Sequence, residues 1–227
     1  MVDVSPRAHP SPTPIVFFDL DGTIVDSYEG IANGYRHVFR ELGLAPPSVE
    51  SLRACVGPPL RGNLVRMLGT GEPARIEAAV TSFRAYYSTR GWAENRVYDG
   101  VRELLHAVRA SGRRLVVATG KPRIFAERIV EHAGLAPLFE GVIGPPLDAG
   151  RDDKAVLLAH ELPTRGWVCP GAPLVGDRRE DVRAALANDL RPVGITWGYG
   201  DRAELSSAGA TTILETPAAV LEHLLAT

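Results

Sequence analysis

The sequence is poor in the features that mark disulfide-bonded, zinc-binding or membrane-spanning proteins. It has only two cysteines, Cys55 and Cys169, and they are too far apart to suggest a disulfide framework or a zinc site. We expect both to be buried free thiols. No stretch approaches the roughly 18 apolar residues of a transmembrane helix, and no apolar run of signal-peptide length is present at the start. These absences predict a cytoplasmic protein that has no contact with a membrane.

A strong charge of one sign is also absent. The chain has 25 lysine and arginine residues against 27 aspartate and glutamate residues, which gives a formal net charge of −2. The arginines are scattered rather than grouped, so nothing favours a nucleic acid polymer or an anionic membrane as a partner. We therefore expect a small-molecule partner, and a chain that is either a monomer or a homodimer.

Proline is concentrated at the start of the chain, and the remainder has an ordinary globular composition. Residues 1–14 hold four prolines and no long apolar run, which predicts a disordered tail. Of all 227 residues, 45% are hydrophobic, which is enough for a sizeable core and argues against disorder of the whole chain.

Beyond this tail, short apolar runs alternate with helical patterns. The runs predict strands at 15–19, 114–119, 141–144, 173–177 and 192–196, and TTIL closes the series at 211–214. Apolar residues at helical spacing predict helices over 100–111, 122–133 and 179–188, and another from Thr216-Pro217. Strands that alternate with helices form a parallel sheet covered on both faces. The pattern therefore predicts an α/β fold.

The stretch from Ser27 to about Arg96 has helical patterns and no convincing strand. Ser27 can cap a helix that ends at Gly43, and Pro73 suits the first position of a second helix. We therefore predict that residues 27–96 form a helical domain inserted into a core made of residues 15–26 and 97–227.

Two aspartates one residue apart follow the first predicted strand, in IVFFDLDGTIVDS (15–27). Asp-Gly between apolar runs is a strong hairpin signal, so a simple turn is one interpretation. A calcium loop is excluded, because its sixth and twelfth positions would be Ile24 and Gly30 instead of glycine and glutamate. A functional site is the other interpretation that stays open.

In an open parallel sheet, the carboxyl ends of neighbouring strands converge where the strand order reverses, and ligands bind there. Several polar residues follow predicted strands or begin predicted helices, and they are Asp19, Asp21, Thr119, Gly120, Lys121, Lys154, Asp177 and Asp181. The topology would bring four carboxylates, a hydroxyl and one or two ammonium groups into one crevice.

This ordered set resembles the haloacid dehalogenase-like (HAD) hydrolase superfamily. The residues that carry the resemblance are DLDGT (19–23), ATGK (118–121), Lys154 and GDRRED (176–181). Within the superfamily the chain looks most like the phosphoglycolate phosphatase and 5′-nucleotidase-like branch, through VGPPLR (56–61), YDG (98–100), KPRIFAERIVEHAGL (121–135) and WGYG (197–200). The resemblance implies a Rossmann-like three-layer core and a helical cap of the C1 type, formed by residues 27–96.

The resemblance also implies roles for the motif residues. Asp19 would attack phosphorus and form an aspartyl-phosphate, and Asp21 would exchange protons with the leaving alcohol and with water. Thr119 and the backbone N–H groups of Leu20 and Gly120 would hold phosphate oxygens, with Lys121 nearby, while Lys154 balances charge between phosphate and Asp19. Mg²⁺ would be bound by Asp19, the backbone carbonyl of Asp21, and Asp177, with Asp181 in or next to this shell.

The loop of Gly57 and Pro58 is expected to face the site from the cap, and Arg61 or Arg53 could meet an anionic substrate. A purely structural turn is an equally good interpretation of Gly-Pro-Pro.

The expected function is therefore Mg²⁺-dependent hydrolysis of a small phosphorylated metabolite, of the phosphoglycolate or nucleoside 5′-monophosphate type. A phosphomutase and a non-catalytic phosphometabolite-binding protein remain as alternatives.

Overall fold

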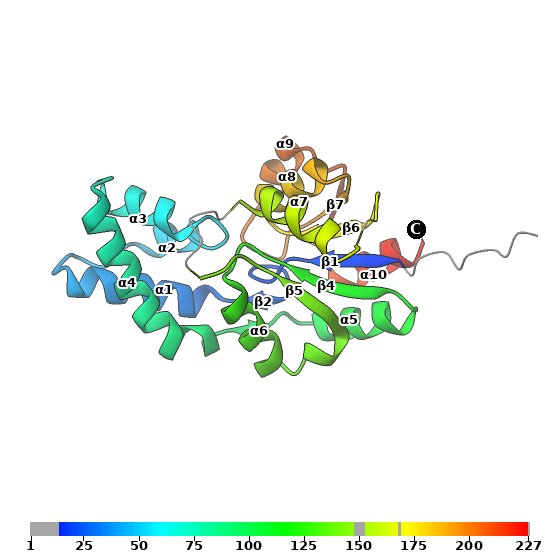
Figure 1. Cartoon of the computed structure of the whole chain (residues 1–227), viewed down its shortest axis with the longest axis horizontal. Helices are drawn as coiled ribbons and strands as arrows, with labels where there is room; N and C mark the ends of the chain where they lie inside the picture. The colour runs from blue at the N-terminus through cyan, green and yellow to red at the C-terminus, as the bar shows by residue number, and fades with distance from the viewer. Residues whose placement is uncertain (1–13, 148–152, 168, 227) are drawn as a thin grey trace, which may run out of the picture.

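A six-stranded parallel sheet organises the larger part of the molecule (Figure 1). The computed structural model describes residues 14–147, 153–167 and 169–226. The strands lie in the order β5 (Phe139–Ile143), β4 (Arg114–Ala118), β1 (Ile15–Phe18), β6 (Pro173–Gly176), β7 (Arg191–Ile195) and β8 (Thr212–Leu214). The strand predictions at 15–19, 114–119, 141–144, 173–177 and 192–196 are confirmed within a few residues, and the TTIL segment contains β8. The tail predicted for residues 1–14 lies, apart from Pro14, outside the described residues.

The first strand, β1, determines where a ligand can bind. It pairs in parallel with β4 on one side and with β6 on the other. Because the chain builds the sheet outward from β1 in both directions, the loops after β1, β4 and β6 meet at the switch point of the strand order.

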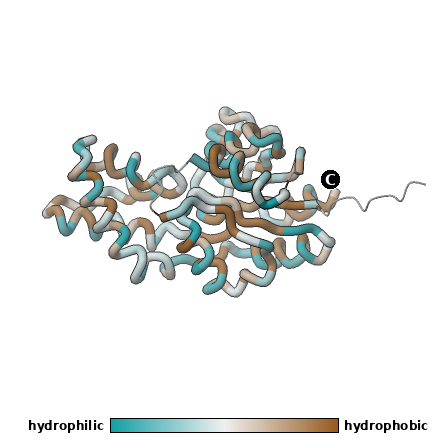
Figure 2. Tube along the Cα trace, in the orientation of Figure 1, coloured by the Kyte–Doolittle hydropathy of each residue, from teal (hydrophilic) through white to brown (hydrophobic). Residues whose placement is uncertain are grey.

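Both faces of the sheet are covered by helices, as the alternation of strands and helices predicts. Val16 and Phe18 pack on one face, and Ile15 and Phe17 pack on the other, because successive strand residues point to opposite sides. The first face is covered by α5 (Val101–Ala110), α6 (Arg123–His132) and α10 (Pro217–Leu225). The second is covered by α7 (Lys154–Thr164) and α8 (Arg179–Ala187), beside which α9 (Arg202–Ala208) packs. Figure 2 shows the central strands as a hydrophobic band between more polar helices.

A group of helices lies at one end of the sheet in Figure 1 and has a hydrophobic cluster of its own. The elements are α1 (Tyr28–Glu41), α2 (Val49–Arg53), α3 (Leu60–Leu68), α4 (Pro73–Thr89) and the short 3₁₀ turn η1 (Gly91–Ala93). Helices α1 and α4 pack along each other through Tyr35 and Phe83, whose ring centroids are 5.0 Å apart. The two longer helices were predicted, whereas α2 and α3 were not; α2 has only five residues, which is too few to show a clear period.

Two short strands join the helical group to the sheet part. The strands β2 (Val25–Asp26) and β3 (Arg96–Val97) pair antiparallel. The prediction that 27–96 contains no strand is therefore wrong at Arg96, because two residues cannot display an alternating pattern. The hairpin interpretation of Asp21-Gly22 is also wrong, since β1 pairs with β4 and β6 rather than with the segment that follows the turn.

The two cysteines differ in their burial. Cys55 is a buried free thiol, as expected, whereas Cys169 is only half-buried. The 3₁₀ turn η2 (Ala136–Leu138) leads from α6 into β5. Within the described part of the chain, no helix combines the length and apolarity needed to cross a membrane.

Candidate active site

Three of the four carboxylates predicted to converge lie together. Asp19 follows β1, Asp177 follows β6, and Asp181 lies in the first turn of α8. Each offers a carboxylate oxygen, and these oxygens lie within 4.8 Å of one another. All three residues are at least 95% buried, since their relative exposures are 5%, 0% and 2%. The sheet topology therefore creates a compact acidic cluster at the switch point.

Lys154 lies in this cluster, as its place in the motif order predicted. It is the first residue of α7, directly after Asp153, whose carboxylate caps the helix. Its ammonium group donates to Asp19 at 2.7 Å and also to Asp181. Burial lowers the pKa of Lys154, but the two carboxylates outweigh burial and raise it above the ordinary value. The side chain is therefore a buried cation that links two acids.

Burial leaves the remaining negative charge poorly compensated. It raises the pKa of Asp19 to about 7, against the favourable effect of Lys154. The pKa of Asp177 is raised well above its ordinary value, by burial first and then by Asp181 and Asp19. A nearby cation would stabilise the ionised form of carboxylates whose pKa is raised in this way.

The donor set fits a hard divalent cation such as Mg²⁺. Carboxylate oxygens of Asp19, Asp177 and Asp181 are available together, and Mg²⁺ prefers oxygen ligands while keeping several waters. The side chain of Asp21 lies outside this group, and the role of its backbone carbonyl as a metal ligand stays a prediction.

Asp21 faces the helical group instead. Its carboxylate accepts a hydrogen bond from the Ser27 hydroxyl and pairs with the Lys121 ammonium at 3.0 Å. Ser27 does precede α1, but its side chain makes no capping hydrogen bond, because the hydroxyl is used by Asp21. Lys121 also donates to the Tyr87 hydroxyl of α4 at 2.6 Å. Neither Ser27 nor Tyr87 was predicted from the sequence as a partner of this pair.

Three residues expected to bind phosphate, Thr119, Gly120 and Lys121, surround the same space, whereas Leu20 does not line it. The Thr119 hydroxyl accepts the backbone N–H of Lys121 at 3.2 Å, which fixes the turn after β4. Gly120 and Lys121 line the same cavity as Asp19 and Thr119. Leu20 is fully buried, and its carbonyl accepts the N–H groups of residues 23–25, which closes the turn after Asp19.

The WGYG segment supports Asp177 from the other side. The backbone N–H of Tyr199 donates to the Asp177 carboxylate at 2.7 Å, and the Thr23 hydroxyl donates to it at 3.3 Å. A Cβ at Gly198 would collide with the carbonyl oxygen of Gly22 and with the Asp177 carboxylate. In the sequence, this segment was used only as evidence for the phosphoglycolate phosphatase and 5′-nucleotidase-like branch. The structure shows that a side chain at Gly198 would not fit.

Replacing Gly198 by alanine is expected to lower the free energy of unfolding by about 1–3 kcal/mol, because the added methyl group overpacks the Asp177 site. Urea denaturation measures this. Gly62→Ala is the matched control, since nothing lies within 4 Å of a Cβ at that position in α3. It is expected to stabilise the protein by about 0.5–1 kcal/mol. Equal stability of the two variants would contradict the packing argument.

The predicted cap loop lies over the site, whereas Arg53 of α2 does not. Gly57 and Arg61 line both of the cavities described below, and Pro58 lines the smaller one. Arg53 lines neither, because its guanidinium lies over the Tyr28 ring, 5.3 Å from the centroid. The prediction that Arg53 could meet the substrate is therefore not supported by its position.

Arg178 connects this loop to the sheet part. Its guanidinium donates to the Val56 carbonyl at 2.6 Å and to Glu204 at 2.9 Å. Burial opposes ionisation of Glu204, but bonds from Arg179 and Arg178 lower its pKa to about 2. Asn63 holds the loop from within by donating to the carbonyls of Cys55 and Pro58, at 2.9 and 3.0 Å. Neither Arg178 nor Asn63 was singled out from the sequence.

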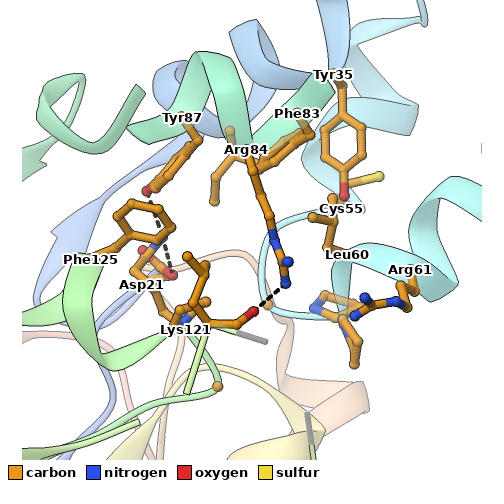
Figure 3. Close-up of a pocket in the computed structure, with 17 residues that line it drawn as sticks. Asp21, Tyr35, Cys55, Leu60, Arg61, Phe83, Arg84, Tyr87, Lys121 and Phe125 are labelled. Atoms are coloured by element: carbon orange, nitrogen blue, oxygen red, sulfur yellow. Dashed lines mark hydrogen bonds and ion pairs between the residues drawn. The ribbon is translucent and has the colours of Figure 1, made fainter. Parts of the chain in front are cut away.

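Two cavities meet at the site. The larger, of about 540 Å³, has Asp19, Asp21, Asp181, Thr119 and Lys154 on its wall. The smaller, of about 120 Å³, lies between the helical group and the sheet part and is shown in Figure 3. An acid-lined chamber with a side pocket is an arrangement suited to a charged group that carries a less polar substituent.

The decisive comparison concerns most of the chain. Residues 16–195 match the sequence profile of the haloacid dehalogenase-like hydrolases. The chain belongs to this family. The acidic cluster is the one expected of a metal site in a haloacid dehalogenase-like hydrolase, and the resemblance drawn from the four motifs is confirmed.

Relatives in this family carry different names. The tyrosine-protein kinase PtkA of Mycobacterium tuberculosis is 40% identical over 210 residues, which cover 92% of this chain and 70% of PtkA. A 5′-nucleotidase of Pseudomonas aeruginosa is 36% identical over 192 residues, covering 85% and 86% of the two chains. The structure of a predicted phosphatase from Clostridium acetobutylicum superposes with a TM-score of 0.88 at 33% identity, covering 96% of this chain and 100% of the other.

Proposed function

We propose that the chain is a Mg²⁺-dependent phosphatase that hydrolyses small phosphate monoesters, of the phosphoglycolate or nucleoside 5′-monophosphate type, through an aspartyl-phosphate at Asp19. The observation that carries this proposal is the bonding of Lys154 to both Asp19 and Asp181 beside Asp177, on the wall of a cavity that can take a phosphoryl group. Phosphoryl transfer depends mainly on positioning and charge compensation, which such a cluster provides.

The proposed steps use residues that line the larger cavity. A carboxylate oxygen of Asp19 forms a bond to phosphorus while the ester P–O bond breaks, and the departing oxygen takes a proton from Asp21. Water then attacks phosphorus, gives its proton to Asp21 and releases orthophosphate, which regenerates Asp19. Thr119 and Lys154 would hold phosphoryl oxygens, and Mg²⁺, when bound at Asp19, Asp177 and the Asp21 carbonyl, would supply positive charge.

We also propose that residues 27–96 act as a cap over this cavity. Two contacts between the parts support it, namely Lys121 with Tyr87 and Arg178 with the Val56 carbonyl. A cap that closes over a small substrate excludes bulk water while the aspartyl-phosphate forms.

A second candidate function follows from the relative named tyrosine-protein kinase PtkA. The phosphoryl group of an aspartyl-phosphate can be transferred to water or to another hydroxyl group. One site can therefore serve a phosphatase or a phosphotransferase. The two activities differ in the molecule that accepts the phosphoryl group. A phosphomutase, the alternative left open by the sequence, also differs from a phosphatase only in this acceptor.

The test is a product analysis of the purified chain. With p-nitrophenyl phosphate and Mg²⁺, we expect stoichiometric release of nitrophenol and orthophosphate, and no release in EDTA. Phosphoglycolate, nucleoside 5′-monophosphates and sugar phosphates are then compared by the same phosphate assay, and ATP is supplied with a tyrosine peptide. Phosphate transfer to the peptide without orthophosphate would replace the phosphatase by a kinase, and an isomeric product would indicate a mutase. Ligand binding without any turnover would indicate a binding protein.

A further inference from the structure

The smaller cavity differs in character from the acid-lined chamber beside it. Four aromatic side chains on its wall form a continuous row, with centroid distances of 5.0, 5.6 and 5.1 Å between neighbours, and in order they are Tyr35, Phe83, Tyr87 and Phe125. Figure 3 shows these rings around the pocket. Such spacings are those of favourable aromatic pairs, so another ring placed here would extend the row.

The cations on the cavity wall already have partners. Arg61 makes a two-pronged ion pair with Glu77, at 2.6 and 2.9 Å. Arg84 donates to the Leu147 carbonyl, and Lys121 pairs with Asp21. A carboxylate in this cavity would have to compete for these groups, whereas an uncharged ring would leave every pair intact.

The smaller cavity is joined to the larger, acid-lined cavity. Residues on both walls are Asp21, Gly57, Pro59, Arg61, Gly120 and Lys121. Asp21 therefore lies where the two spaces meet, which is the place for the oxygen between a phosphoryl group and its substituent. A group in the smaller cavity would be the leaving group of a phosphate ester held in the larger one.

The size of the cavity limits this group. It measures about 120 Å³. By comparison, an apolar cavity of about 150 Å³ accepts benzene. A single ring therefore comes close to filling the space, and a complete nucleoside is too large for it.

We propose that the preferred substrate is a monocyclic aryl phosphate, whose ring lies in the aromatic cavity. This inference rests on the proposed phosphatase function, but it replaces the phosphoglycolate or nucleoside 5′-monophosphate type by a different substrate class. In the reaction, Asp19 forms a bond to phosphorus, the aryl P–O bond breaks, and the phenolate takes the proton from Asp21; water then releases orthophosphate and returns a proton to Asp21. The phenol can belong to a small metabolite or to a tyrosine side chain.

Binding of substrate analogues tests the cavity without turnover. We expect benzylphosphonate to bind the Mg²⁺-loaded protein at least about tenfold more tightly than methylphosphonate in calorimetry, because only the former buries a ring. Leu60→Trp should remove the difference, since Leu60 lines the cavity and a larger side chain would fill it. Val65→Trp is the matched control, because Val65 lies on the same helix with 41% exposure, away from the cavity lining. Equal affinity of the wild-type protein for both phosphonates overturns the proposal.

Turnover separates this proposal from the proposed function and identifies the source of the phenol. The substrates are phenyl phosphate, free phosphotyrosine, a phosphotyrosine peptide and phosphoglycolate. We expect kcat/KM for phenyl phosphate to exceed that for phosphoglycolate by at least about tenfold, in line with the ring's burial, and Leu60→Trp to reverse this. A preference for phosphoglycolate overturns the substrate class and leaves the phosphatase standing. Absence of phosphate from every substrate overturns the phosphatase, while the phosphonate experiment still decides whether the cavity binds a ring.

Discussion

Asp19→Asn is expected to lower phosphate release by at least about 10⁴-fold, because the amide oxygen of asparagine is a poor nucleophile. The substitution keeps the size of the side chain, so the acidic cluster and the larger cavity should keep their shape. The measurement is turnover of p-nitrophenyl phosphate with saturating Mg²⁺, together with mass spectrometry for a phosphorylated protein, which should be absent in the variant.

The control for this variant is Asp189→Asn. Asp189 is exposed and has a positive φ of 54°, a conformation that asparagine tolerates well. We expect its activity and stability to match those of the wild-type protein. If Asp19→Asn retained turnover within about tenfold of the control, the assignment of Asp19 as the nucleophile would be wrong.

The stability of the metal-free protein is expected to fall between pH 5.5 and 8. The pKa of Asp19 rises from its ordinary 3.8 to about 7 in the folded protein, mainly through burial. Between about pH 4 and pH 7 the folded protein holds a proton that the unfolded chain has released, so about half of the total loss falls above pH 5.5. The stabilising contribution is therefore complete at low pH and is lost as pH rises through about 7. A three-unit shift corresponds to about 4 kcal/mol at most, and Asp177 shifts in the same direction.

Mg²⁺ should reverse this loss, because a cation bound by the ionised carboxylates stabilises the folded state. Urea unfolding at pH 5.5 and 8, with EDTA or with Mg²⁺, measures both effects. Glu204, with a pKa of about 2, changes stability only below its ordinary 4.5 and stays outside this window.

The difference between wild type and Asp19→Asn isolates the carboxylate from other titrating groups. His223 is one of these groups, because burial lowers its pKa and its contribution therefore changes in the opposite direction. We expect the metal-free variant to lose less stability than wild type as pH rises. Metal-free wild-type protein that became more stable relative to the variant towards pH 8 would contradict this account.

Much of the fold could be predicted because strands, helix starts and helix ends depend on residues that are close in the sequence. Apolar runs identified the strands, and Gly43 and Pro73 correctly marked a helix end and a helix start in the inserted segment. The strand β3 escaped prediction, because it consists of two residues that pair only with β2. Arg53 was placed near the substrate by its closeness in sequence to the cap loop, whereas the rotation of α2 directs its side chain onto Tyr28.

The sequence by itself determined that acids and hydroxyls follow the strands of a parallel sheet, because an apolar run and the polar residue after it are adjacent in the chain. Only the tertiary structure decided which of these groups touch. Lys154 meets Asp19 across 135 positions, and Lys121 meets Tyr87 across 34. Such contacts depend on the order of the strands and on how the inserted helices rest against the sheet. The aromatic cavity arises in the same way, since its rings come from α1, α4 and α6 and meet only when these helices pack.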